Sequence, residues 1–245
     1  MNKSGNWGVV GLLIAGAAAG VFGARYFFPR PPEPGLSSAV PAAPSIPSNL
    51  PALEDSDKYA REKAAGLSAD LSLREWLEGD DVIARLTAAF NRAAHGQIPR
   101  DILAPFAPRE KFKVVKKDKR FIIDPACYAR YDKVAAFVAS VDARAAADVF
   151  TALLPLFDAA QRALGEPNTS AQEALLAAVR ELTAAPVVEG DVALKAGKKG
   201  IGWAYADDKL ENLSPAQKQL IRLGPKNQAV VQAKLRAIAE ALGPR

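Results

Sequence analysis

The sequence predicts a mainly α-helical domain with one or two small β-hairpins, preceded by one transmembrane helix and a proline-rich linker. Three observations support this fold class. Residues typical of helix starts precede apolar residues at helical spacing, two short segments carry β-branched and aromatic residues instead, and an apolar stretch near the N-terminus runs into a segment rich in proline. These features divide the chain into an N-terminal transmembrane anchor (1–28), a linker (29–51) and a helical soluble domain (52–245).

The composition is that of a folded protein with an ordinary charged surface. Hydrophobic residues make up 49% of the 245 residues and charged residues 24%, so the chain can bury a core. The segment Arg109–Arg120 holds seven basic and two acidic residues, while the net charge of the whole chain is +5. Because the positive charge is concentrated in one short segment, a broad nucleic-acid-binding surface is not expected. The single cysteine, Cys127, excludes an intramolecular disulfide and a cysteine-rich metal site.

The stretch Trp7 to Ala24 has the length and composition of a membrane-spanning helix. Its 18 residues carry no charge and would span roughly 27 Å as a helix, about enough for a bilayer core. A cleavable signal peptide, with a cleavage site at Ala17–Ala19, is the alternative. Apolar and aromatic residues continue past that site, which favours an uncleaved, single-pass anchor. Gly16 and Gly20 could let two such helices pair as a homodimer, although a small-residue helix lying alone in lipid is the simpler interpretation.

The segment Pro29–Pro51 contains eight prolines among its 23 residues, with alanine and serine between them. Such a segment favours extended polyproline geometry at about 3.1 Å per residue, which gives roughly 70 Å at full extension. We interpret it as a spacer that holds the domain away from the bilayer. A PxxP ligand for a partner protein is the alternative.

Helix starts are predicted at several places in the domain by residues that can cap the first backbone amides. The candidates are the capping boxes Ser72–Glu75, Ser170–Glu173, Asp208–Glu211 and Ser214–Gln217, the cap Asp124 before Pro125, and the further caps Asp80 and Asp142. Apolar residues follow these caps at helical spacing, for example Val82, Ile83, Leu86 and Phe90. Because each apolar face needs another to be buried, we predict one domain rather than two.

Two stretches break the helical pattern and predict β-hairpins. Phe112–Asp124 has β-branched and aromatic residues on two arms that turn near Lys117 and Asp118. A second, smaller hairpin would pair Val192–Leu194 with Ile201–Tyr205.

The hairpin at 112–124, hereafter the basic hairpin, is the most distinctive candidate site. Its basic residues crowd one turn, where like charges repel unless solvent or an anionic partner screens them. The candidate residues for contact with an anion or a partner are Lys113, Lys116, Lys117, Lys119 and Arg120. The alternative is a solvated hairpin whose lysines prevent edge-to-edge aggregation.

Tyr128, Arg130 and Tyr131 form a second candidate group. Tyr128 and Tyr131 would share one helix face with Arg130 beside them, which suits a buried polar network or a small anion site. The network is the preferred interpretation.

No assembled catalytic set can be derived from the sequence. The only histidine, His95, sits where the helix dipole favours a cap rather than a catalytic base. Cys127 is best explained as a small buried side chain. Asp207, Asp208 and Glu211 offer few oxygen ligands and are better explained as helix caps than as a metal site. We therefore predict no catalytic residue, metal or cofactor.

The chain resembles an uncharacterised bacterial family, domain of unknown function 3014, over residues 50–243. The resemblance lies in Leu50-Pro51, Trp76-Leu77, Asn91 with Gly96, Tyr128-Ala-Arg130-Tyr131, Pro155-Leu156-Phe157, Leu164-Gly165-x-Pro167, Tyr205-x-x-Asp208-x-Leu210-Glu211 and Gly224-Pro225-x-Asn227. It implies a bacterial protein with an N-terminal membrane helix, a proline-rich linker and a helical domain. It implies no activity, cofactor or catalytic residue.

Together with this resemblance, the sequence predicts a single-pass protein of the bacterial inner membrane. The basic residues on the two sides of the span are nearly balanced and leave its orientation open, while the composition beyond the span favours a helical domain in the periplasm. The expected function is that of a non-enzymatic binding or scaffold protein of the cell envelope. Its expected contacts are the lipid bilayer through the N-terminal helix and an envelope protein or anionic surface partner. The alternative is an envelope hydrolase or transferase that uses carboxylate residues.

Overall fold

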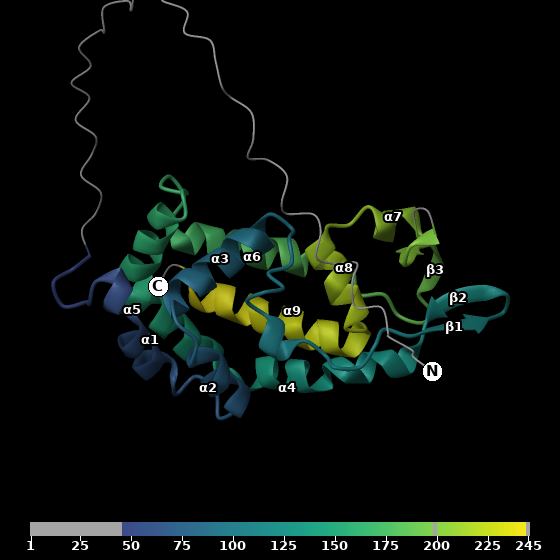
Figure 1. The fold of residues 1–245 in the computed structure, drawn as a ribbon, viewed down its shortest axis with the longest axis horizontal. Coiled ribbons are helices and arrows are strands. Elements are labelled where there is room, and N and C mark those ends of the chain that lie inside the picture. The colour runs from purple at the N-terminus through teal and green to yellow at the C-terminus, as the bar shows by residue number, and fades with distance from the viewer. Residues whose placement is uncertain (1–45, 198–199, 244–245) are drawn as a thin grey trace, which may run out of the picture. The chain divides into compact units, whose positions relative to one another are not determined.

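The computed structural model describes residues 46–197 and 200–243 (Figure 1). The predicted span from Trp7 to Ala24 and most of the linker lie outside these residues. Within the described part, no helix combines the length and apolarity needed to cross a membrane.

The described residues are mainly helical, as the sequence predicts. The α-helices are α1 (Asp57–Ala64), α2 (Leu71–Leu77), α3 (Val82–Ala94), α4 (Asp132–Ser140), α5 (Ala143–Ala163), α6 (Ala171–Thr183), α7 (Asp208–Glu211), α8 (Pro215–Arg222) and α9 (Pro225–Ala241). Three short 3-10 helices are η1 (Leu53–Asp55), η2 (Ala104–Phe106) and η3 (Pro125–Tyr131). The strands are β1 (Val114–Lys117), β2 (Arg120–Ile123), β3 (Ala193–Ala196) and β4 (Trp203–Tyr205).

The helix α9 lies among the other helices and contacts α4, α5, α6 and α8 (Figure 1). One hydrophobic cluster joins α1, α2, α3 and α5 and includes Trp76, Ile83, Leu156 and Phe157. A second cluster packs the sheet against α8. The helices therefore hold the sheet at one end through a core that is separate from the larger one.

The two predicted hairpins join into one antiparallel sheet with the order β1-β2-β3-β4. Between the hairpins, Phe121 pairs with Leu194 and Ile122 with Ala193. The buried face of the sheet carries Ile123, Leu194 and Tyr205, which pack against Ile221 of α8. The sequence predicts each hairpin, but not the pairing of β2 with β3 that makes them one element.

Three buried glutamine side chains bind backbone carbonyl groups at the C-terminal end of α6. We call Gln217, Gln228 and Gln232 the glutamine clamp. The last carbonyls of a helix have no partner within it, and burial without a hydrogen bond would be costly. The side-chain amides donate to these carbonyls and to those just beyond: Gln217 to Glu181 (3.0 Å), Gln232 to Leu182 (3.1 Å) and Ala185 (2.8 Å), and Gln228 to Ala185 (3.2 Å) and Pro186 (3.0 Å). The clamp thus ties α8 and α9 to the point where the chain leaves α6.

Four of the predicted helix caps are confirmed. Ser170 and Ser214 begin α6 and α8 with complete capping boxes. The Asp142 carboxylate accepts the amide hydrogen of Ala145 at the start of α5. Asp124 also caps as predicted, but the turn that it begins is the 3-10 helix η3.

Three other cap predictions were wrong by one or two residues. Asp70, not Ser72, caps α2, and Asp207, not Asp208, caps α7; each carboxylate accepts the amide hydrogen two residues ahead. The residue before α3 is Asp81 rather than Asp80, and it makes no side-chain cap bond. Two residues able to cap lie within two positions of each other at each of these starts, so sequence spacing alone does not select between them.

Replacing a clamp glutamine with methionine should destabilise the fold, because the substitution keeps the side-chain volume but leaves buried carbonyls without a donor. We expect Gln232→Met to lower the free energy of unfolding by about 1–3 kcal/mol. Gln97 is exposed, so Gln97→Met serves as the control and should change stability little. Chemical denaturation measures both variants. Equal stability of the two would show that the clamp does not stabilise the fold.

Candidate functional site

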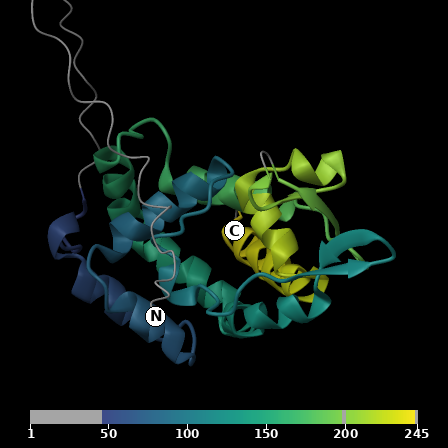
Figure 2. The same ribbon diagram turned by 45° about the vertical axis from the view of Figure 1, so that its right-hand side comes forward.

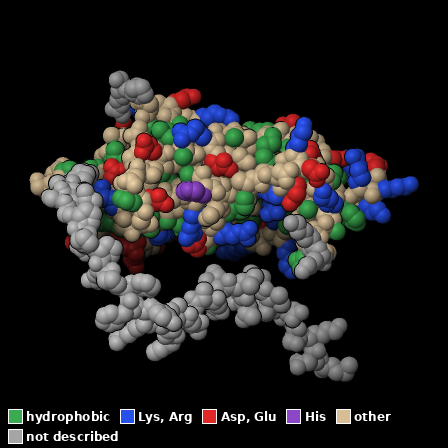
Figure 3. Space-filling view, turned by 90° about the horizontal axis from the view of Figure 1, so that it is seen from above, with side chains coloured by type: hydrophobic (Ala, Val, Ile, Leu, Met, Phe, Trp, Pro, Cys, Tyr) green, Lys and Arg blue, Asp and Glu red, His purple; other side chains and the backbone are tan. Residues whose placement is uncertain are grey.

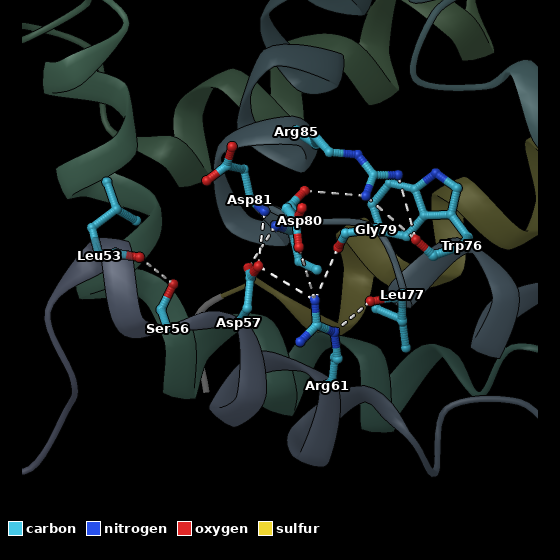
Figure 4. A network of polar contacts seen from close by, with 11 residues as sticks. Leu53, Ser56, Asp57, Arg61, Trp76, Leu77, Gly79, Asp80, Asp81 and Arg85 are labelled. Atoms are coloured by element: carbon cyan, nitrogen blue, oxygen red, sulfur yellow. Dashed lines mark hydrogen bonds and ion pairs between the residues drawn. The ribbon is translucent and has the colours of Figure 1, made fainter.

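A polar network near the N-terminal end of the described chain joins α1 to the loop before α3 (Figure 4). The Asp57 carboxylate on α1 accepts the backbone amides of Asp81 (2.9 Å) and Val82 (2.8 Å). It therefore caps α3 from another helix. The φ of Asp81 is +56°, and the backbone there does not let this residue cap the helix itself.

Two arginines bind carbonyl groups around the C-terminal end of α2 (Figure 4). Arg61 donates to the carbonyls of Leu77 (2.7 Å) and Gly79 (3.1 Å). The Arg85 guanidinium lies 4.3 Å from the centre of the Trp76 ring. An open hollow of about 530 Å³ beside Arg61 is lined by residues of α1 and α2 and the loop between them. The side chains of Asp57, Arg61 and Arg85 already bind backbone groups of the protein itself, so we assign the network a structural role.

The basic hairpin is built on the edge strand β1 and its neighbour β2. Asp118 (φ +48°) and Lys119 (φ +66°) form its turn, and both lie in the left-handed region. Two successive left-handed residues are typical of the tight two-residue turn that matches the twist of a hairpin. The register that results places Lys117 opposite Arg120 and Lys116 opposite Phe121.

All five candidate basic side chains are exposed. Lys117 pairs with Asp191 at 2.8 Å, and this hydrogen bond raises the pKa of Lys117. In residues 46–197 and 200–243, the other four have no carboxylate within ion-pair distance: Lys113, Lys116, Lys119 and Arg120. Figure 3 shows Lys and Arg side chains gathered at the end of the domain where the hairpin lies.

An exposed aromatic pair lies next to these charges. Phe121 is 43% exposed and Trp203 39% exposed, and their ring centres are 4.9 Å apart. Phe121 and Trp203 each lie two residues from a buried member of the same sheet face, Ile123 and Tyr205 respectively. Ala196 is opposite Trp203 in the register, and its small side chain leaves room for the indole to reach Phe121. Sequence reasoning missed Phe121, although its alternation with Ile123 was a usable signal.

The structure brings Arg130 and Tyr131, two of the three candidate residues, into contact. Arg130 donates to the Tyr131 hydroxyl (3.2 Å) and to the Glu110 carbonyl (3.2 Å), and Gln219 donates to the same hydroxyl (2.8 Å). The Arg130 guanidinium also lies over the rings of Tyr131 (4.7 Å) and Phe112 (5.4 Å). These contacts form a polar network that holds the base of the basic hairpin against η3 and α8.

Tyr128 has a different role from its two predicted partners. Its ring covers Gly224, where a Cβ atom would lie only 2.4 Å from the Tyr128 Cγ atom. Its carbonyl accepts a hydrogen bond from the Asn227 side chain at 3.2 Å. Partial burial raises the pKa of the Tyr128 hydroxyl. Tyr128 therefore joins η3 to the start of α9, whereas the Arg130 side chain binds Tyr131 and Glu110.

Asp208 and Glu211, two of the acidic residues at 207–211, bind different partners. Asp208 pairs with Lys195 on β3 (3.0 Å), whereas Glu211 accepts hydrogen bonds from Lys218 (2.9 Å) and from the Tyr205 amide (2.8 Å). The Lys218 contact, with the Tyr205 amide, lowers the pKa of Glu211. Burial raises the pKa of Tyr205 to about 12. Among the described residues, no three His, Cys, Asp or Glu side chains are grouped so that they could hold a metal ion.

His95 and Cys127 lie where their surroundings give them structural roles. His95 is the exposed C-cap of α3, with Nδ1 2.8 Å from the Asn91 carbonyl oxygen. Cys127 is buried, and its sulfur accepts the amide hydrogen of Lys113 at 3.4 Å.

A family model with the description "Protein of unknown function (DUF3014)" matches residues 82–239. The match spans α3 through most of α9, and so includes the sheet, the basic hairpin and the glutamine clamp. No curated protein and no solved structure matches the chain.

Removal of the Asp57 carboxylate should destabilise the protein, because this side chain on α1 caps the start of α3. We expect Asp57→Ala to lower the free energy of unfolding by about 0.5–2 kcal/mol, because two amides at the start of α3 lose their acceptor. Asp55→Ala, at an exposed position two residues earlier, is the matched control. Thermal or chemical denaturation would contradict the assignment if both variants were equally stable.

The lowered pKa of Glu211 predicts a pH dependence of stability. Its folded pKa lies below the ordinary value of 4.5, so its contribution is present above pH 4.5 and is lost as the pH falls through the folded pKa. Glu211→Gln should therefore weaken the fold at pH 7 and reduce the loss of stability on acidification. Glu166→Gln, at an exposed position, is the control. Denaturation curves at pH 7 and below pH 4.5 check this, and identical acid sensitivity of Glu211→Gln and the wild type would contradict it.

Proposed function

This chain belongs to the family described as Protein of unknown function (DUF3014), and we propose that it is a membrane-tethered, non-enzymatic binding or scaffold protein of the bacterial cell envelope. Its domain would contact an anionic partner through the basic hairpin. The observation that carries this proposal is the set of four exposed basic side chains that have no carboxylate partner among the described residues.

Protection of a sheet edge does not account for the positions of these charges. Lysines on an edge strand discourage pairing with another chain, and this explains Lys116 on β1. Lys119 lies in the turn, and Arg120 lies on β2, which is paired on both sides. Neither is needed to protect the edge. Their repulsion is relieved if an anionic surface binds against the turn.

The tether supports a contact that is weak by itself. The apolar segment Trp7 to Ala24 and the spacer Pro29–Pro51 would keep the domain within a limited distance of the membrane. A tethered domain meets neighbouring surfaces at a high effective concentration, so modest affinity is sufficient for occupancy. Pairing of anchors through Gly16 and Gly20 would add a scaffold function to the same layout.

The alternative, a hydrolase or transferase that uses carboxylates, requires two carboxyl groups facing each other roughly 5–10 Å apart. Asp70 and Glu78 are the carboxylates that line the hollow beside Arg61. Asp70 accepts the Ser72 amide and caps α2, and this hydrogen bond lowers its pKa. A general acid needs a raised pKa. Asp70 thus serves as a helix cap at this hollow, and we favour binding over this chemistry.

Removing the positive charge of the basic hairpin should weaken its proposed contact with an anionic partner. A photoreactive residue at position 118 in the full-length chain would report partners in cells, and we expect Lys116→Gln, Lys119→Gln and Arg120→Gln together to reduce its cross-linking about tenfold or more. High salt should reduce cross-linking of the unsubstituted chain in isolated membranes in the same way, because exposed charges are screened.

The control for this experiment changes the net charge equally at a distance from the hairpin. Lys58, Lys63 and Arg100 are exposed, and their replacement by glutamine should leave cross-linking from position 118 unchanged. If the hairpin variant and the control variant cross-linked to the same extent as the unsubstituted chain, the contact role of the hairpin would be rejected.

A further inference from the structure

The sheet extends beyond the helices that cover it. In both ribbon views the β1–β2 hairpin projects past the neighbouring helices (Figures 1 and 2). On the covered part of the face, Ile123 and Tyr205 are buried, whereas Phe121 and Trp203 continue the same face and are only half covered. Ile201, just before β4, is 79% exposed. The apolar face of the sheet thus ends in an exposed aromatic surface.

Positive charge lies next to this aromatic surface, at the end of the hairpin. Lys116 is the cross-strand partner of Phe121, so both side chains project from the same face of the sheet. Lys119 lies in the turn, and Arg120, the residue before Phe121 in β2, projects from the opposite face at the same end of the hairpin. We call Phe121, Ile201 and Trp203, with their neighbours Lys116, Lys119 and Arg120, the sheet tip.

We infer that the sheet tip binds the surface of an anionic phospholipid bilayer, an inference that rests on the proposed function and names its partner. Lys and Arg side chains bind lipid phosphates, and the rings of Trp and Phe partition into the boundary between headgroups and acyl chains. The sheet tip offers both groups together. Basic residues near such a surface each strengthen binding by about fivefold, so three of them matter.

A bilayer fits these observations better than a small anionic ligand does. The hollow between α1 and α2 and the hollow beside η1 and α3 are lined by residues far from the sheet tip in the sequence. The sheet tip instead presents side chains outward on a projecting hairpin, which suits a broad surface. The proposed tether also makes the bilayer the surface that the domain meets most often.

The contact would hold the domain to the membrane at two places, the anchor and the sheet tip. The spacer, roughly 70 Å at full extension, sets how far the domain can travel when the tip is released. Because the second contact depends on charge, lipid composition and ionic strength would decide how often the domain lies against the bilayer.

The test places a fluorescent label on the sheet tip of the full-length chain in vesicles. Cys127 is replaced by alanine, and Ile201→Cys carries an environment-sensitive nitrobenzoxadiazole label. The chain is reconstituted into vesicles of equal parts phosphatidylcholine and phosphatidylglycerol, or of phosphatidylcholine alone. We expect the label to shift to the blue and to be quenched by spin-labelled lipid only in the anionic vesicles, and high salt to reverse both effects.

Two controls separate tip binding from general closeness to the membrane. Leu71 on α2 is also an exposed apolar residue, and a label at Leu71→Cys should remain in water in both kinds of vesicle. Lys116→Gln, Lys119→Gln and Arg120→Gln together should return the label at position 201 to water. Equal signals from positions 71 and 201, or no effect of the three substitutions, would overturn the inference.

The result also distinguishes this inference from the proposed function. If the label at 201 remained in water on anionic vesicles while cross-linking from position 118 in cells still required the three basic residues, the anionic partner would be a protein. The lipid inference would then be wrong and the proposed function would stand. If neither signal depended on these residues, both would be wrong.

Discussion

The position of the sheet depends on how the buried end of α6 satisfies its carbonyl groups. The glutamine clamp supplies donors from α8 and α9 to carbonyls between Glu181 and Pro186. Only a few residues later, the Val192 carbonyl accepts the Ile123 amide at 3.0 Å and starts the pairing of β3 with β2. The clamp therefore fixes where the chain departs from the helices toward the sheet, and the basic hairpin is placed through β3.

The other side of the sheet is fixed by contacts between η3 and α9. Asn227 donates to the carbonyl of Tyr128 and to the side chain of Asp132, and the Tyr128 ring closes over Gly224, whose φ of +81° would strain any other residue. Residues that carry the family resemblance thus turn out to hold the hairpin in place. This explains why they indicate the architecture of the domain and reveal no chemistry.

Structural features could be predicted from the sequence where the interacting residues are close together in the chain. Ser170 and Ser214 have their capping partners three residues away, and the basic hairpin has its turn within its own arms, so both could be predicted. Prediction failed where the partner is distant in the chain. The cap of α3 comes from Asp57, and the neighbour of β2 is β3, some seventy residues further on. For the candidate site, the charges could be predicted from composition, whereas the Phe121–Trp203 pair requires that β2–β3 pairing.

A domain built in this way displays charge and aromatic surface on a supported sheet rather than on a loose loop, which is how a binding surface keeps its geometry. The account makes the order of the sheet depend on the glutamine clamp. Amide hydrogen exchange of Gln232→Met measures this most directly. We expect faster exchange at β2 and β3 together with the end of α6, while the amides of α1 and α3 keep their protection. Unchanged protection of β2 and β3 in that variant would contradict the account.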